Sequence, residues 1–274
     1  MNKRLLYFFA FFIPFCLVPA MRSAGVAAAR GHFVTVMTSR GTVCEVSVEE
    51  YAARVVAAEE YVDDPETAKA LAVTVRSAAE YVRKHGGKHE GFDFCVSPDC
   101  CFPYAEENFG AGFAAAEATR GTVIAVGGEA AMTAYCVCSG RGTGNAPGFP
   151  ALTAAARPEC RIHKREMNFD CAEIEKRLGS SPEKGVCLVY GGGVCEYAVI
   201  GDVLCEGKEV AQALGLPSLC FEASVEDGQA TFICFGSGCG YGLDLCFAAD
   251  AAKRGSDWKT ILKQAFPKAE LLTE

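Results

Sequence analysis

The chain has 274 residues, of which 50% are hydrophobic, and it carries a net charge of -8 with a pI of about 5.2. The apolar fraction excludes a disordered chain, and the lack of repeated long apolar runs excludes a polytopic membrane protein. The acidic balance repels a phosphate backbone, so nucleic acid is not expected as a partner.

The N-terminal residues have the composition of an export signal. Lys3 and Arg4 precede an apolar run over residues 5–20 that is too short for a membrane-spanning helix. We expect a signal peptide over residues 1–20, cleaved after Ala20 or later, near Ala24; an uncleaved anchor is the alternative. Either reading places the rest of the protein outside the cytoplasm, in the periplasm or cell envelope.

The chain contains 16 cysteines. Loss of Cys16 with the leader would leave an odd number, in a compartment where disulfides can form. At least one thiol is therefore expected to be free, metal-bound or paired between chains. Cysteines within apolar strands are expected to act as small buried hydrophobic residues.

The first half of the chain is rich in helix signals. Ser47 and Glu50 predict a capping box, and Asp64 with Pro65 predicts the start of a second helix that Gly86 ends. In chain order, we expect a strand pair over residues 32–46, a helix to about residue 60, a helix over 65–85, a loop over 89–104 and a short helix over 111–120.

The second half is rich in hairpin signals, with glycine pairs between apolar runs. We expect hairpins around Gly127–Gly128, at residues 191–193 and near residues 226–228. We also expect helices over residues 170–178 and 256–266, and another helix that ends at about residue 253. This order predicts a single α+β domain over residues 31–272, with helices early and β-hairpins late.

Two charged residues stand out on the early helices. Glu59 ends an Ala/Val-rich helix face, where partial desolvation would raise its pKa and suit it to general acid chemistry. A solvated helix terminus is the alternative. Arg76 follows the apolar Val75 and is either a surface charge or a fork that holds an anionic or sugar group.

The thiols of Cys95, Cys100 and Cys101 lie close in sequence, with His85 and His89 nearby. Two thiolates and an imidazole would suit zinc, although the spacing is not a CxxC motif. A disulfide within this loop is the alternative.

Residues 236–242 have glycine at every second position. The segment lacks the βαβ context of a dinucleotide-binding loop. Its glycines instead predict that another backbone or a sugar ring approaches closely.

Taken in order, these segments resemble the SpoIID (stage II sporulation protein D) family, which includes the LytB-type amidase enhancers. The resemblance covers about residues 40–272. The matching segments are Glu49-Glu50-Tyr51 with Val56-Ala57-Ala58-Glu59, residues 65–76, residues 92–95 with Cys100 or Cys101, residues 118–123, Ala134-Tyr135, Ser139-Gly140 with Thr143, residues 214–218 with Phe221, and residues 236–242 with Gly255, Trp258, Ile261-Leu262 and Phe266-Pro267.

The resemblance implies a lytic transglycosylase that cleaves peptidoglycan between N-acetylmuramic acid and N-acetylglucosamine. It places the catalytic glutamate at Glu59 and requires no cofactor, with structural zinc as an option at Cys95, Cys100 and Cys101. Glycan strands are the implied partner, and a cell-wall amidase is a further candidate. The candidate substrate-binding residues are Arg76, Tyr135, Ser139, Gly140, Thr143, Ser218 and Tyr241.

The chain departs from the family pattern at several positions. The histidine of the closing GHG motif is Tyr241 here, its later glycine is Asp244 and the glutamine that follows is Phe247. Arg141 replaces a loop glycine, and Asp99 stands where some relatives carry histidine. Either Glu59 works in an altered groove, or the domain binds glycan, or enhances an amidase, without cutting. The odd cysteine count leaves a third possibility, a disulfide-linked structural protein of the envelope.

Overall fold

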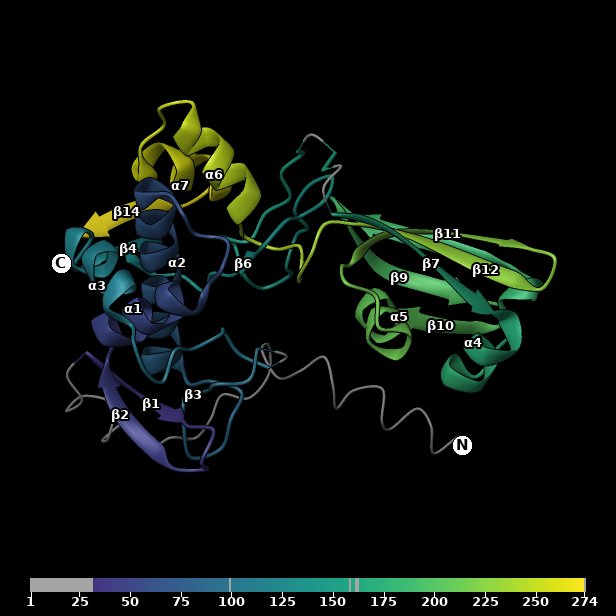
Figure 1. The fold of residues 1–274 in the computed structure, drawn as a ribbon, viewed down its shortest axis with the longest axis horizontal. Coiled ribbons are helices and arrows are strands. Elements are labelled where there is room, and N and C mark those ends of the chain that lie inside the picture. The colour runs from purple at the N-terminus through teal and green to yellow at the C-terminus, as the bar shows by residue number, and fades with distance from the viewer. Residues whose placement is uncertain (1–31, 99, 158, 161–162, 274) are drawn as a thin grey trace. The chain divides into compact units, whose positions relative to one another are not determined.

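The computed structural model describes residues 32–98, 100–157, 159–160 and 163–273 (Figure 1). The expected leader and Asp99 lie outside the described residues. The predicted α+β class is confirmed. The chain divides into two compact units: unit 1 holds residues 32–133, 148–151 and 269–273, and unit 2 holds residues 134–147 and 152–268, apart from the positions that are not described.

Unit 1 combines three helices with two small sheets. Strands β1 and β2 are antiparallel and β3 joins β1 in parallel, while β4 lies between β5 and β14. The bounds are β1 (Phe33–Met37), β2 (Val43–Ser47), α1 (Val48–Ala58), α2 (Pro65–His85), β3 (Phe94–Cys95), α3 (Gly110–Ala118), β4 (Thr122–Val126), β5 (Glu129–Ala130) and β14 (Glu270–Thr273).

The helix caps of unit 1 largely follow the sequence. The Ser47 hydroxyl accepts a hydrogen bond from the Glu50 N–H and begins α1, as predicted. The reciprocal half of the capping box does not form, because the Glu50 carboxylate binds Arg54 at 2.9 Å. For α2, the Asp64 carboxylate accepts from the first-turn N–H groups and Gly86, at φ +87°, ends the helix.

Helices α1 and α3 touch at their backbones. A Cβ added at Gly112 of α3 would lie 1.9 Å from the carbonyl oxygen of Ala53 in α1. Helix α1 also packs on α2, with Tyr51, Val55 and Leu71 fully buried. Helix α1 is therefore held by two other helices.

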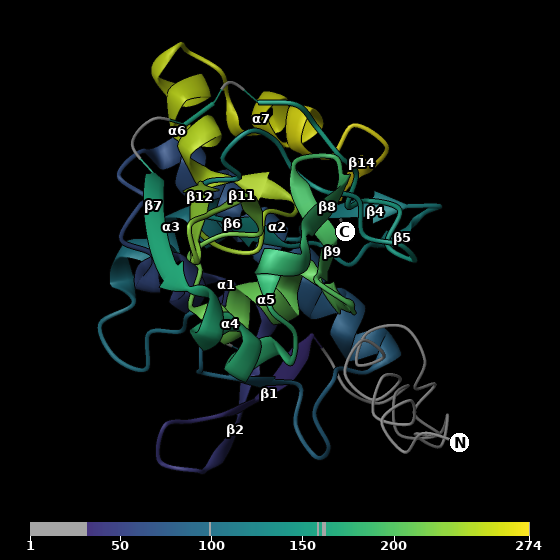
Figure 2. The ribbon, with the colours of Figure 1, turned by 90° about the vertical axis from the view of Figure 1, so that its right-hand side faces the viewer.

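Unit 2 contains two three-stranded antiparallel sheets and four helices (Figures 1 and 2). Sheet order is β10-β9-β8 in one and β11-β12-β7 in the other, and β6 pairs in parallel with β13. The bounds are β6 (Tyr135–Cys136), β7 (Lys164–Asp170), α4 (Cys171–Leu178), β8 (Val186–Gly191), β9 (Val194–Ile200), β10 (Val203–Glu206), α5 (Gly207–Leu214), β11 (Cys220–Glu226), β12 (Gln229–Phe235), β13 (Leu243–Asp244), α6 (Leu245–Lys253) and α7 (Trp258–Ala265).

The core of unit 2 lies between the two sheets and helices α4 and α5. Ile174 of α4, Val210 of α5, Ile200 of β9 and Phe232 of β12 are all fully buried in one cluster. Helices α4 and α5 lie side by side in Figure 2. Burial of this cluster supplies the main stabilising term for the unit.

Two predicted hairpins are confirmed: β8 and β9 turn at residues 191–194, and β11 and β12 turn at Asp227. The hairpin at Gly127–Gly128 was predicted to pair residues 123–126 with residues 131–138; its second strand is wrong, because β4 pairs with Glu129–Ala130 and β6 pairs with β13. The hydroxyl of the buried Thr133 donates to the Thr74 carbonyl of α2 at 2.6 Å, which draws the segment away from β4.

Helices α4, α6 and α7 were predicted, whereas β7, β10, α5 and β14 were not. Among the described residues, no helix combines the length and the apolar character that crossing a membrane requires.

Candidate functional site

Glu59 occupies the C-cap of α1. Its backbone leaves the helix in an extended conformation, at φ -87° and ψ 119°, and its N–H donates to the Val56 carbonyl at 3.3 Å. The side chain is partly exposed. The carboxyl group therefore sits at the end of a packed helix and can reach a ligand from solvent.

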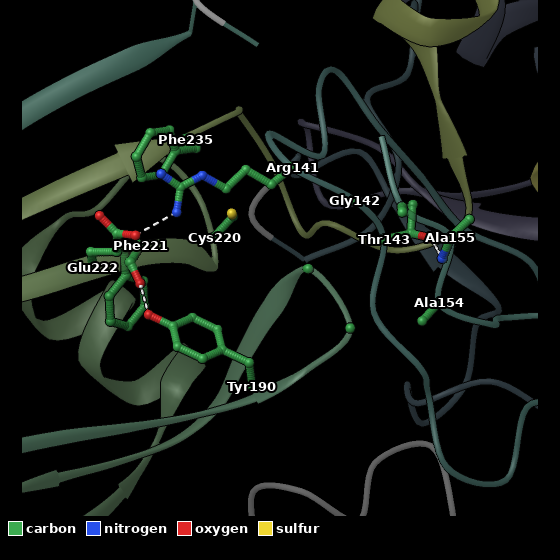
Figure 3. A pocket seen from close by; sticks show the side chains of 13 residues that line it. Arg141, Gly142, Thr143, Ala154, Ala155, Tyr190, Cys220, Phe221, Glu222 and Phe235 are labelled. Carbon is green, nitrogen blue, oxygen red and sulfur yellow. Dashed lines mark hydrogen bonds and ion pairs between the residues drawn. The ribbon is translucent and has the colours of Figure 1, made fainter. Parts of the chain in front are cut away.

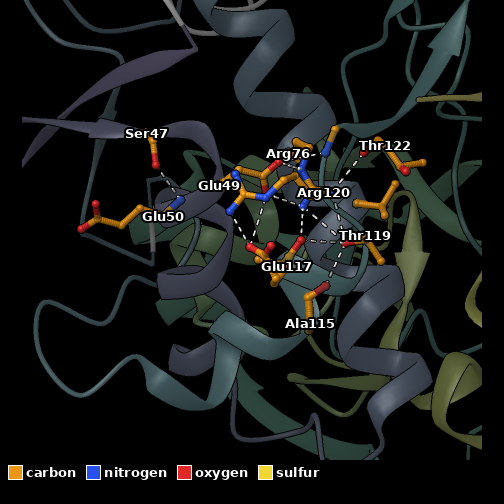
Figure 4. Close-up of polar contacts among 12 residues, drawn as sticks. Ser47, Glu49, Glu50, Arg76, Ala115, Glu117, Thr119, Arg120 and Thr122 are labelled. Carbon is orange, nitrogen blue, oxygen red and sulfur yellow. Dashed lines mark hydrogen bonds and ion pairs between the residues drawn. The ribbon is translucent and has the colours of Figure 1, made fainter. Parts of the chain in front are cut away.

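The first turn of α1 is anchored by a buried ion pair (Figure 4). The Nε and Nη2 atoms of Arg76 on α2 donate to the two carboxylate oxygens of Glu49, at 2.9 and 2.6 Å. Further donations reach the carbonyls of Ala116 and Thr122 and the Thr119 hydroxyl. This two-point pairing fixes both the position and the orientation of Glu49.

The structure gives the guanidinium of Arg76 partners within the protein, and its contact with a substrate stays a prediction. Arg76 is 2% exposed, and each terminal nitrogen of its guanidinium already donates to several protein oxygens. The fork that would suit a sugar or an anion instead ties α1 and α2 to the end of α3. A cavity of about 320 Å³ opens beside the pair, and Glu80 and Arg120 contribute to its lining.

Two more contacts fix the middle of α1. Arg54 donates to the carbonyls of Ala105 and Glu106 at 2.9 and 2.7 Å, and its guanidinium lies 3.9 Å from the Phe109 ring centroid. Tyr51 stacks on Phe94 with centroids 4.5 Å apart. Since Phe94 immediately precedes Cys95, the cysteine loop supports the helix that ends in Glu59.

The cysteine loop gathers four ligand-type side chains. The Nε2 atom of His89 lies 3.2 Å from the Cys101 sulfur and 3.7 Å from the Cys100 sulfur. The ligand atoms of these three residues and of Cys95 all lie within 4.8 Å of one another. His85 does not join them, because its ring stacks on Tyr81 and hydrogen-bonds the Tyr81 carbonyl.

The protonation states within this cluster are mixed, because two of its groups favour the form that binds a metal whereas burial raises the pKa of Cys101 to about 12. Burial and the neighbouring Lys88 lower the pKa of His89, which favours the neutral imidazole. Burial opposes ionisation of Cys95, but hydrogen bonds from the Ser97 N–H and from the other two thiols outweigh it and lower the pKa of Cys95. The cysteines in the described part of the chain are free thiols, so no disulfide forms in this loop.

The remaining predicted site residues belong to unit 2, and several are occupied internally. The Ser139 N–H and hydroxyl both donate to one oxygen of Asp244, at 2.9 and 2.6 Å, and Ser139 is fully buried. The other Asp244 oxygen caps α6 by accepting from the Phe247 N–H. Asp244, a departure from the family pattern, therefore holds the Ser139 loop to the start of α6.

Thr143 and Ser218 are buried and bonded in the same way. The Thr143 hydroxyl donates to the Thr153 carbonyl at 3.1 Å and accepts from the Ala155 N–H at 2.9 Å. The Ser218 hydroxyl accepts from the Cys220 N–H at 3.0 Å. The structure thus gives the hydroxyls of Ser139, Thr143 and Ser218 internal roles in place of the predicted sugar contacts.

The alternating glycines of residues 236–242 admit another backbone. A Cβ at Gly242 would lie 2.0 Å from the Ala134 carbonyl oxygen, and one at Gly236 would lie 2.4 Å from the Cys138 carbonyl oxygen. Gly140, at φ +77°, packs against the Phe235 carbonyl in the same manner. The sequence predicted that either another backbone or a sugar ring would approach these glycines. In the structure, another backbone lies next to Gly236 and Gly242.

Tyr135 and Tyr241 are the aromatic members of the predicted set. Tyr135 is mostly buried in β6, and its carbonyl oxygen accepts a hydrogen bond from the Cys239 thiol, with sulfur and oxygen 3.4 Å apart. The Tyr241 ring lies against Gly144, and burial, followed by the nearby Cys239, raises the pKa of Tyr241 to about 12. Tyr241 can therefore donate a hydrogen bond at neutral pH but cannot act as a base there.

A cavity of about 530 Å³ in unit 2 receives part of the predicted loop (Figure 3). Arg141 and Thr143 line it, opposite Tyr190 and Glu222. The Arg141 guanidinium lies 3.5 Å from the Phe235 ring centroid and forms an ion pair with Glu222. The cavity therefore combines aromatic side chains with one guanidinium and one carboxylate.

Sequence reasoning missed Tyr190, Glu222 and Phe235 as cavity residues, because they lie on strands remote from the loop in sequence. Arg141 was noted only as the loss of a glycine. Its charge in a glycine-rich loop was the one available signal.

The comparisons identify the first segment. A family model described as SpoIID, stage II sporulation protein, matches residues 37–125. Over that segment the chain is similar to the SpoIID family. This is a family related to sporulation and the cell wall. No curated protein matches the chain. The SpoIID match lies within unit 1 and contains Glu59, Arg76 and the Cys95–Cys101 cluster, whereas Tyr135 and the later candidates fall outside it.

Proposed function

We propose that the protein is a lytic transglycosylase that cleaves peptidoglycan glycan strands, with Glu59 as its acid and base. The observation that carries the proposal is the placement of Glu59, within the SpoIID match, at the end of a helix clamped at Glu49, Tyr51 and Arg54. A positioned carboxyl group is what general acid–base catalysis requires.

In this proposal the reaction starts from the protonated carboxyl group of Glu59. The carboxyl group is partly buried and follows the last carbonyls of α1, the negative end of the helix dipole. Glu59 protonates the glycosidic oxygen as the bond to C1 of N-acetylmuramic acid breaks. Its carboxylate then takes the proton of the C6 hydroxyl of that sugar, whose oxygen bonds to C1 and closes a 1,6-anhydro ring.

The proton that Glu59 loses in the first step is regained in the second, so no water is consumed. The nucleophile belongs to the substrate, and a second catalytic carboxylate at the spacing of a hydrolase is not required. In the same proposal, the Arg141–Phe235 cavity and Tyr241 of unit 2 bind glycan, and the protein acts outside the cytoplasm, where peptidoglycan is found.

The Cys95–Cys101 cluster is proposed to hold a structural zinc ion with His89 as the fourth ligand. The donor set fits, since three thiolates and a neutral imidazole are a preferred zinc environment. Bound metal would supply a rigid cross-link at this loop. Through Phe94 and Tyr51, that loop supports α1 and therefore the position of Glu59.

A second candidate is a module that binds glycan, or enhances an amidase, without cutting. It is favoured by the internal use of Ser139, Thr143, Ser218 and Asp244, which leaves unit 2 with altered groove chemistry. Under this reading Glu59 is dispensable and the cavity at Arg141 is the functional surface.

The deciding experiment is digestion of purified glycan strands, with and without stem peptides, followed by mass spectrometry for anhydro-ended fragments. Wild type should release them, and Glu59→Gln should release less by at least about 100-fold, because general acid–base catalysis contributes that much or more. The control is Glu60→Gln, which changes an exposed neighbouring carboxylate and should keep wild-type activity. Strands that bind wild type but stay uncut would favour the binding module.

A further inference from the structure

Unit 2 contains a second group of three thiols and an imidazole, outside the SpoIID match. Its members are Cys138, Cys160, His163 and Cys246. Cys138 follows β6, His163 immediately precedes β7, and Cys246 lies in the first turn of α6. The four residues come from parts of the sequence more than a hundred positions apart, so the fold alone brings them together.

The ligand atoms are close enough to share one ion. The Nδ1 atom of His163 lies 3.4 Å from the Cys160 sulfur and 3.9 Å from the Cys246 sulfur. The Cys138 thiol is in hydrogen-bond contact with both other thiols. The ligand atoms of Cys138, Cys160 and His163 lie within 4.8 Å of one another, as do those of Cys138, Asp244 and Cys246.

These distances match the edges of a tetrahedral zinc site. With Zn–S of about 2.3 Å and Zn–N of about 2.1 Å, neighbouring ligand atoms lie about 3.6 to 3.8 Å apart. The two measured separations fall on either side of that range. The four ligand atoms form two overlapping groups that share Cys138 and do not all lie within 4.8 Å of one another, so a bound ion would have to draw them closer together.

The backbone around the ligands is already cross-linked. The Cys160 N–H donates to the Gly140 carbonyl at 2.8 Å, the Cys246 N–H donates to the Val137 carbonyl at 3.0 Å, and the Cys138 and Ser237 backbones exchange two hydrogen bonds. The Gly140 N–H donates to the Cys138 sulfur. Donation of this kind stabilises a metal-bound thiolate and orients it.

Asp244 is the other ligand type at the site, and its oxygens are already used. They accept three hydrogen bonds, two from Ser139 and one from the Phe247 N–H. The softer sulfur and nitrogen ligands remain, and they are the ones that zinc selects over calcium or magnesium. Asp244 instead places a fixed negative charge beside the ion.

A disulfide is a poorer use of the same residues. Three thiols cannot all pair within the group, so any single disulfide leaves one thiol and an imidazole beside it. The structure joins none of these three cysteines in a disulfide. Cysteines that only fill space in a core need no histidine beside them, whereas His163 contacts both Cys160 and Cys246.

We propose that Cys138, Cys160, His163 and Cys246 bind a second zinc ion, distinct from the one at His89. Four protein ligands leave no open position, so this ion is structural. It fastens the loop that begins at Ser139 to β7 and α6, and it thereby sets the wall of the cavity at Arg141. The proposal is independent of the transglycosylase activity.

The test is metal analysis of the full-length protein, purified anaerobically under reducing conditions with zinc in the growth medium. Wild type should contain two zinc ions per chain. The double variant Cys100→Ser, Cys101→Ser removes ligands of the unit 1 cluster and should retain one. Adding His163→Ala or Cys246→Ser in that background should reduce the content to zero, while Cys187→Ser, a change at an exposed cysteine outside both clusters, should keep it at one.

A substitution that fails to fold would mimic loss of zinc, so a retaining variant is included. Cys246→His should still bind one ion, and cobalt in its place should show weaker thiolate-to-metal charge-transfer absorption than in the parent because one thiolate is lost. Zinc absent from the Cys100→Ser, Cys101→Ser protein, or retained after His163→Ala and Cys246→Ser, overturns the proposal. A disulfide between two of the three cysteines in the purified wild type also overturns it.

Discussion

Arg76 is a charged side chain whose guanidinium hydrogen-bonds to groups within the protein. Its guanidinium spans α1, α2 and the end of α3, and only an arginine offers donors in the planar fork that matches both oxygens of Glu49. Removal of one partner leaves the other charge poorly solvated, which costs far more than the pair contributes. The arginine therefore fixes the position of α1, the helix that ends next to Glu59.

Replacement of Arg76 by alanine is expected to reduce the free energy of unfolding by about 3 kcal/mol, because Glu49 would stay partly buried without its partner. Urea denaturation followed by circular dichroism measures the effect. The matched control is Lys84→Ala on the same helix, whose ion pair with Glu129 is exposed and should hardly matter. Equal stability of the two variants would contradict the assigned role.

At the scale of single residues, the sequence predicted local placement better than contacts between distant segments. Glu59 and the cysteine loop were located by residue type and order, since helix ends and clustered thiols are local features. The internal bonds of Ser139, Thr143 and Ser218 were not predicted, because their partners lie in segments that only the fold brings near. The spacing of Cys160 and His163, which are separated by two residues, was a usable ligand signal for the second cluster.

Among the elements, the contact of α1 with α3 depends on a single missing side chain. Gly112 lies within α3 and is buried, and it allows the two helix backbones to touch at Ala53. Glycine costs a helix stability through its freedom in the unfolded chain. The close approach explains why that cost is accepted here.

Gly112→Ala is expected to lower the free energy of unfolding by about 2 kcal/mol, because its Cβ would meet the backbone of Ala53 and of Ala57. Gly110→Ala is the matched control on the same helix. Its Cβ would enter open space, so it should leave stability unchanged or raise it by a few tenths of a kcal/mol. Thermal unfolding of both proteins checks the sign, and destabilisation by Gly110→Ala alone would refute the packing argument.

Element prediction succeeded where turn and cap residues are explicit. Caps at Ser47 and Asp64 and turns at residues 191–193 and 226–228 fixed helices and hairpins correctly. β7 and α5 were missed because β7 has charged and polar residues along an exposed strand, and the α5 cap is the less common Glu206. Their positions are determined by pairing with β12 and by packing on the core of unit 2.

For the molecule as a whole, buried phenol and thiol groups make the folded state more stable at neutral pH than at alkaline pH. Burial raises the pKa of Tyr104 and Tyr190 to about 12, that of Cys195 to about 12 and that of Cys234 to about 11. The unfolded chain loses these protons first, near the ordinary values of 9 for a thiol and 10 for a phenol. The folded state therefore holds more protons in that range, and its stability must fall as pH rises.

The midpoint of urea denaturation should accordingly be constant near neutral pH and decrease progressively from about pH 9 to about pH 12. Tyr104→Phe should flatten part of this decrease by removing one such proton. Tyr197→Phe, which alters a phenol that is 44% exposed, should keep the wild-type profile. A midpoint that rises over this interval would show that the sign is wrong.

The overall class was predictable from the alternation of helix and hairpin signals, but the division into two units was not. Unit 1 contains residues from three separate stretches of sequence, and no linker of distinctive composition marks where the chain leaves it. Contacts between distant segments define the units, and such contacts are invisible to periodicity. For the same reason, the proximity of Cys138 to Cys246 could not be predicted from the sequence.

Strand β14 has a consequence for the order of assembly. It pairs with β4 from Thr122 to Ala125, and the hydroxyls of Thr122 and Thr273 are 3.1 Å apart. During synthesis β14 leaves the ribosome only after all of unit 2. The sheet beside α2 therefore keeps an unpaired edge on β4 while the intervening residues are made, and it is completed only when β14 has been synthesised.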